Sequence, residues 1–221
     1  MKAYQRMCLE IIDTSFSSPE AKYLFEWFEK VTKPGSQNII LKDRFPFYYD
    51  GEFWLFKIPY FCGTVNLEPV AQYLEMPLEI KSRFISEQLN YEEYRYYFYA
   101  CLHYCQNLNE VIRLLQQDTE TKKWLKAADA ELRAGIEIIL SEHSRYRSVL
   151  SLRNALENFL KALIFYKERL DTGKMKKISH NLQSAFDKVI EITKYNKLEE
   201  LREIIEKFPK VEDRYNESIN R

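Results

Sequence analysis

The sequence predicts a mainly α-helical protein with a single β-hairpin in its N-terminal part. The chain of 221 residues contains only five Gly and seven Pro, so few residues interrupt regular structure. Most of it repeats apolar residues at the three- and four-residue spacing of an amphipathic helix. Residues 45–61 differ, because they are aromatic-rich runs flanking Asp50-Gly51. The two patterns together predict helices on both sides of one hairpin.

Two helices are predicted before the hairpin. The first carries its apolar side chains at Tyr4, Met7, Cys8, Ile11 and Ile12. The second begins at Ser18-Pro19, since proline is favoured in the first turn of a helix, and ends at Lys33-Pro34-Gly35. Its apolar positions are Leu24, Phe25, Trp27, Phe28 and Val31.

The hairpin is predicted between Phe45 and Phe61. Asp50 and Gly51 tolerate the positive φ angles that a tight two-residue turn requires. Helical spacing then returns over residues 78–89 and 91–117.

Four further amphipathic segments follow residue 118. They span Trp124–Leu140, Leu152–Leu163, Leu182–Thr193 and Leu198–Phe208, and Pro209 ends the last one. Because the connections are short, neighbouring helices are expected to pack antiparallel in an up-and-down bundle. We therefore predict two parts, residues 1–118 with helices and the hairpin, and residues 119–221 with the bundle.

Composition narrows the class of protein. Lys and Arg together equal Asp and Glu at 33 each, so the whole chain has no net charge to attract nucleic acid or an anionic membrane. The four cysteines form no Cys-x-x-Cys pair and no secreted disulfide pattern. No segment approaches the roughly 18 uninterrupted apolar residues of a membrane span. A cytoplasmic protein without membrane contact is expected.

The segment ALENFLKAL contains Glu157 and Lys161 four residues apart in an apolar helix. By itself, such a pair predicts an ion pair on a solvent-exposed strip, contributing roughly 0.3–0.5 kcal/mol. The pair does not stand alone, because further residues precede and follow it in a characteristic order. They are Trp124, Ala128 and Leu132, then Ala155, Leu160, Ala162 and Leu163, then His180 and Leu182, and finally Arg214 and Tyr215.

This order resembles the HEPN domain family, in particular members found beside minimal nucleotidyltransferases, and it covers about the last hundred residues. The resemblance implies a helical bundle that pairs as a homodimer. We expect the contact on the helix that carries Arg153, Glu157, Lys161 and Phe165. Many HEPN proteins are metal-independent ribonucleases that use an Arg followed by a His after four to six residues.

The sequence departs from that ribonuclease motif. The candidate catalytic pair is Arg169 and His180, with ten residues between them. His180 also follows Ser179 at a predicted helix start, where it would simply help to fix the loop and cap the helix of Leu182. The chain is therefore expected to lack enzymatic activity, with a ribonuclease of unconventional site as the alternative.

Three other segments contain residue types that could form a binding site. Cys101, His103 and Cys105 cannot close on one zinc ion, because the histidine points away from the cysteines on a helix, so no metal site is predicted. The tyrosine-rich segment 91–99 is expected to pack in the core and at a contact surface. Residues 145–177 carry nine basic against three acidic residues. This surplus is expected of an ordinary solvated loop and helix face, and the alternative is a phosphate-binding patch. For such a patch, Lys174, Lys176 and Lys177 are the candidate ligands for nucleic acid or nucleotide phosphates.

The expected function is a noncatalytic HEPN-like binding module that acts with a nucleotidyltransferase, a nucleotide or RNA, in a toxin–antitoxin or defence setting. No cofactor is expected. A structural protein-interaction module is the remaining alternative.

Overall fold

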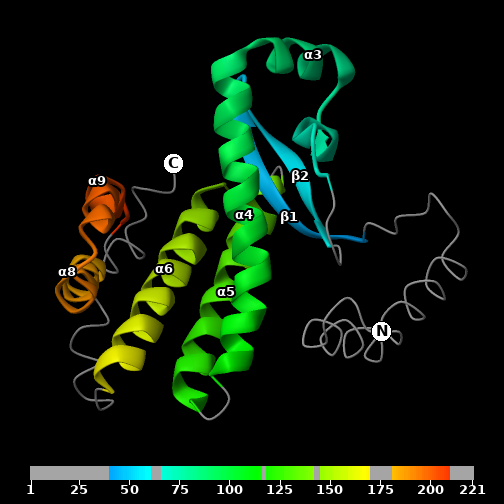
Figure 1. Cartoon of the computed structure of the whole chain (residues 1–221). Coiled ribbons are helices and arrows are strands. Elements are labelled where there is room, and N and C mark those ends of the chain that lie inside the picture. Colours follow the sequence, from blue (N-terminus) through cyan, green and yellow to red (C-terminus); the bar gives the residue numbers. More distant parts are fainter. Residues whose placement is uncertain (1–39, 61–65, 116–117, 142–144, 170–180, 210–221) are drawn as a thin grey trace, which may run out of the picture.

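The computed structural model describes residues 40–60, 66–115, 118–141, 145–169 and 181–209 (Figure 1). It is mainly helical, with one small three-stranded antiparallel sheet, and this agrees with the predicted fold class. The two helices predicted before the hairpin lie outside the described residues.

The predicted hairpin is confirmed. Strand β1 (Ile40–Tyr49) pairs antiparallel with β2 (Glu52–Tyr60) around Asp50 and Gly51, whose φ angles are 55° and 84°. Positive φ at both central residues matches the right-handed twist of the strands, which is why the Asp-Gly pair forms the turn. A third strand, β3 (Leu74–Glu75), adds to β2. The sequence did not indicate it, because two residues are too few for a recognisable alternation.

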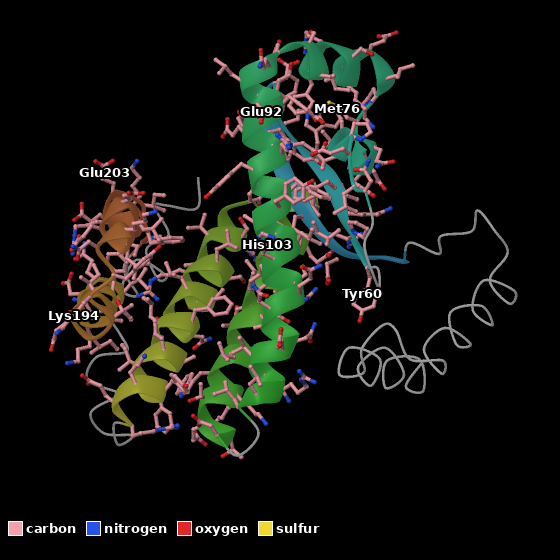
Figure 2. All side chains as sticks on the ribbon, viewed as in Figure 1. Tyr60, Met76, Glu92, His103, Lys194 and Glu203 are labelled. Carbon is pink, nitrogen blue, oxygen red and sulfur yellow. The ribbon has the colours of Figure 1, made fainter. Side chains whose placement is uncertain are left out.

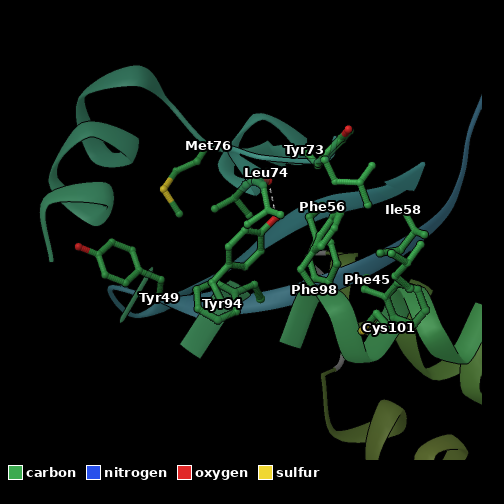
Figure 3. Close-up of a cluster of buried hydrophobic side chains, with 14 of the residues drawn as sticks. Phe45, Tyr49, Phe56, Ile58, Tyr73, Leu74, Met76, Tyr94, Phe98 and Cys101 are labelled. Atoms are coloured by element: carbon green, nitrogen blue, oxygen red, sulfur yellow. Dashed lines mark hydrogen bonds between the residues drawn. The ribbon is translucent and has the colours of Figure 1, made fainter. Parts of the chain in front are cut away.

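Two helices follow the sheet close to their predicted ranges. They are α3 (Leu78–Ser86) and α4 (Gln88–Leu114), preceded by a 3₁₀ helix, η1 (Val70–Tyr73). Aromatic side chains of α4 pack on the hairpin, with the Tyr94 and Phe56 rings 5.4 Å apart in an edge-on arrangement (Figure 3). The Tyr94 hydroxyl donates to the Val70 carbonyl over 3.3 Å, which satisfies its only polar atom in the core.

Helices α5 (Thr119–Leu140) and α6 (Arg145–Glu168) run beside α4 (Figure 1). The C-terminal end of α4, the N-terminal end of α5 and the C-terminal end of α6 meet around one hollow, so these three helices alternate in direction. The up-and-down bundle predicted for residues 119–221 stays a prediction. Gly135 of α5 faces Leu152 of α6. A Cβ atom on Gly135 would lie 2.9 Å from Leu152 Cδ2, so the absence of a side chain permits this close approach.

The remaining helices pack on α6 at its side away from α4 (Figure 1). Helix α8 (Leu182–Thr193) starts at Asn181, whose side chain accepts a hydrogen bond from the Ser184 amide over 3.1 Å. The last predicted helix is divided. It begins as a 3₁₀ segment, η2 (Asn196–Leu201), and continues as the short α9 (Arg202–Glu206).

The described residues form two hydrophobic clusters. The first joins the sheet, α3 and α4 to Ile136 of α5, and the second joins α6, α8 and α9. The first cluster therefore contains residues from both sides of the boundary predicted at residue 118. Ion pairs from Arg44 to Glu137 and from Arg133 to Asp43 connect the same two parts. The domain boundary at residue 118 stays a prediction, although the first cluster extends across it.

Candidate functional site

An open hollow of about 1070 Å³ lies where the ends of α4, α5 and α6 meet, and we call it the end groove. Its lining is mostly apolar and comes from all three helices. The apolar members are Val111, Leu114, Leu115, Leu125, Phe159, Ala162, Leu163, Phe165 and Tyr166. Asp118, Thr119, Glu120, Thr121 and Arg169 supply its polar edge. Three large apolar side chains remain accessible here, with exposed fractions of 42% for Val111, 69% for Leu114 and 47% for Tyr166.

Asp118 organises the polar edge of the end groove. It is the N-cap of α5 and accepts from the Thr121 amide at 3.0 Å and from the Thr121 hydroxyl at 2.7 Å. It also forms an ion pair with Arg169. Burial raises the pKa of Asp118, but the Thr121 hydrogen bonds and the Arg169 charge outweigh it, so the pKa lies below its ordinary value. The carboxylate is therefore kept ionised.

Arg169 is the one predicted catalytic residue that the structure describes. It follows the last residue of α6 with a φ of 51°, in the left-handed conformation common where helices end. Its guanidinium carbon lies 5.8 Å from the Phe165 ring centroid and 5.7 Å from that of Tyr166. His180, Lys174, Lys176 and Lys177 lie outside the described residues, so the proximity of Arg169 to them stays a prediction.

Three of the four predicted interface residues are buried within the chain. Arg153, Glu157 and Lys161 form one row along α6, and Arg153 has an exposed fraction of only 2%. Glu157 accepts from Arg153 Nη1 at 2.8 Å and from Lys161 Nζ at 2.6 Å. The exposed strip predicted for the Glu157–Lys161 pair is thus wrong, because neighbouring elements cover this face of α6.

Phe165 differs from that row. It is half-buried, packs against the second cluster and also lines the end groove. It is therefore the member of the predicted interface set that borders an open surface.

A second polar network lies between the sheet and the helices, and sequence reasoning missed it. Arg133 of α5 pairs with Asp43 of β1, and its Nε donates to Asp129 at 2.9 Å. Asp129 also accepts from the Tyr104 hydroxyl at 2.9 Å. Asp43 borders a hollow of about 220 Å³ together with Tyr60, Cys105, Gln106 and Asn109. No sequence signal could have found this network, because Asp43 and Arg133 are 90 residues apart.

The cysteine, histidine and tyrosine side chains of α4 were the other candidate sites, and the structure shows the environment of each. Burial raises the pKa of the thiols of Cys101 and Cys105 to about 12, so both stay protonated at neutral pH. His103 lies on α4 (Figure 2), and its side chain is exposed. Among the described residues, no three His, Cys, Asp or Glu side chains are grouped to hold a metal ion. Tyr94 and Phe98 are core residues, whereas Tyr96 is exposed.

Comparisons with family models, with curated proteins and with solved structures found no match for this chain. Within the described ranges, none of the helices combines the length and the apolar character needed to cross a membrane.

Proposed function

We propose that the protein is a noncatalytic HEPN-like binding module that binds the phosphates of RNA or a nucleotide at the C-terminal end of α6. One observation carries the proposal. Exposed Lys167 and Arg169 stand beside the half-exposed ring of Tyr166, and the sequence then continues through Lys174, Lys176 and Lys177. Cations beside an accessible aromatic ring suit a single strand, because phosphates pair with the cations and bases stack on the ring.

Arg169 retains capacity for a phosphate although it pairs with Asp118. A guanidinium has five N–H donors, and the pair with Asp118 uses Nη1. The pair also fixes the direction of the side chain, which reduces the conformational entropy that binding would otherwise cost. Asp118 opposes the approach of an anion, and so the lysines further along the chain are needed for affinity.

The nucleotidyltransferase partner, the homodimer and the toxin–antitoxin or defence setting belong to the same proposal. They are supported only by the resemblance of residues 119–221 to HEPN proteins. A cytoplasmic location is also part of the proposal, and it is supported by the four cysteines, which form no Cys-x-x-Cys pair and no secreted disulfide pattern.

The test is fluorescence anisotropy of a labelled single-stranded RNA with the full chain, over a range of salt concentrations. Replacing Lys174, Lys176 and Lys177 by Gln should weaken binding, and the log–log salt dependence should become shallower by roughly 0.7 per lost phosphate contact. The matched control replaces Lys194, Lys197 and Lys207, which are exposed lysines of the α8–α9 region. No binding by the parent at low salt, or equal weakening in the control, would refute the proposal.

The same RNA separates the two remaining alternatives. Cleavage without added metal that disappears in His180→Ala would establish a ribonuclease in place of the noncatalytic module. Competition by a mononucleotide would identify a nucleotide as the ligand. A chain that neither binds nor cleaves would favour the structural interaction module.

A further inference from the structure

We propose that the end groove is the docking site of residues 19–31 of this same chain, which insert their aromatic face between α4 and α6. This inference does not rest on the phosphate site proposed above, although Tyr166 and Arg169 line both surfaces, and its readout, the protection of Trp27, does not depend on RNA binding. It starts from a groove whose walls are apolar and partly uncovered, since Val111, Leu114 and Tyr166 are all substantially exposed. Apolar grooves between helices commonly accept the apolar face of another helix.

Residues 19–31 have the chemistry of such an occupant. Leu24, Phe25, Trp27, Phe28 and Val31 fall on one side of a helical wheel. On the opposite side are the charged residues Lys22, Glu26, Glu29 and Lys30. A helix of thirteen residues is marginal in water by itself, so the helix that the sequence predicts here would require an apolar surface to stabilise it.

The starting point of the described chain brings this segment within reach of the end groove. Ile40 pairs with Tyr60, and Tyr60 borders the small hollow beside Asn109 of α4. From Asn109 to Leu114 the helix advances about 7.5 Å along its axis and turns through about 140°, so the path to the groove also passes around α4. Residues 32–39 can span about 26 Å when extended, which exceeds both this advance and an arc of roughly 12 Å around a helix about 10 Å in diameter.

Another exposed apolar surface fits less well. Leu78 of α3 and Leu89 at the start of α4 are exposed, but this region adjoins the turn end of the hairpin, where Arg83 pairs with Asp50. Ile40 is at the opposite end of β1, about 30 Å away for a strand of this length. Figure 2 likewise shows Tyr60 far from Met76, which lies just before α3.

The experiment uses the full chain with 5-fluorotryptophan at its three tryptophan positions, and Trp27→Phe assigns the Trp27 resonance. A soluble paramagnetic agent broadens the fluorine signals of accessible rings. Trp27 should broaden several-fold less in the native protein than in urea. Leu114→Asp should remove this protection, because it places a charge on the groove wall. Leu89→Asp is the matched control on the same helix, with an exposed fraction of 88%, and should leave Trp27 protected.

Circular dichroism verifies that both variants keep the parental helix content. If Trp27 is as accessible in the native parent as in urea, the proposal is wrong. Protection that survives Leu114→Asp would overturn it as well, since the segment would then dock elsewhere. Protection that disappears on dilution would assign the groove to the segment of a second copy and would refute docking within one chain.

Discussion

The ammonium group of Lys161 lies 4.9 Å from the ring centroid of Trp124, so a side chain of α6 rests on an aromatic ring of α5. Both residues belong to the ordered set of residues on which the proposed HEPN resemblance rests. The contact gives that set a physical role, because a cation over an indole face is attracted by the ring and both groups become shielded from water. Glu157 holds Lys161 from the other side, through the hydrogen bond of 2.6 Å.

Removing the Glu157 carboxylate should strongly destabilise the protein. Glu157→Gln removes the negative charge that the buried cations Arg153 and Lys161 share and replaces one of its two acceptor oxygens by an NH2 donor, and breaking a buried ion pair in this way costs about 3–5 kcal/mol of unfolding free energy. Urea denaturation followed by circular dichroism measures the loss. Adding Lys161→Met should recover part of it, because one buried charge is removed.

Glu92→Gln is the control for this prediction. Glu92 forms an exposed pair with Arg95 at 3.3 Å, and its loss should leave the urea midpoint unchanged. Equal midpoints for Glu157→Gln and the parent would show that the row on α6 does not stabilise the fold.

The effect of an alanine at position 135 should depend on Leu152. In the parent, Gly135→Ala gains up to about 1 kcal/mol of helix propensity but brings its Cβ to 2.9 Å from Leu152 Cδ2. In a Leu152→Ala background this clash disappears, and the same substitution should be stabilising by about 0.5–1 kcal/mol. A double-mutant cycle of unfolding free energies measures the coupling. Additive effects would contradict the close approach of α5 and α6.

Asp118 should make stability depend on pH in the acid range. Its pKa is lowered in the folded chain, so the folded state binds fewer protons than the unfolded state as pH falls. The stabilisation is fully present above the ordinary Asp pKa of about 3.9 and is lost as pH falls through the lower folded value. Asp118→Asn retains a helix cap but cannot titrate. The decline of the urea midpoint from pH 6 to pH 3 should therefore be smaller in the variant, and an equal decline would exclude Asp118 as a source.

The homodimer predicted from the HEPN resemblance is tested by light scattering at micromolar concentration. Of the four predicted interface residues, Phe165 is the one that is not buried within the chain, so Phe165→Asp should reduce the measured mass more than it reduces helix content. Glu168→Gln, on the same helix, removes only an ion pair with Lys188 within the same chain and should leave the mass unaltered. A parental mass equal to one chain would remove the dimer.

Local sequence was sufficient for most of the secondary structure that is described. Asp50-Gly51 specified the hairpin turn because the conformational preference of these two residues is intrinsic to them. The periodic apolar residues likewise predicted α4, α5, α6 and α8, since a helix buries one face at a fixed spacing. The two-residue strand β3 and the division of the last helix into η2 and α9 had no comparable local signal.

The sequence by itself therefore determined a mainly helical chain with one hairpin, and it selected Arg169 and Phe165 as residues of interest. Only the tertiary structure decided that Glu157 and Lys161 are buried, that Asp43 meets Arg133, and that three helix ends enclose a groove. The physical reason is the range of the interactions. Turn and helix preferences act within a few residues, whereas burial and ion pairing depend on which remote segments pack against one another.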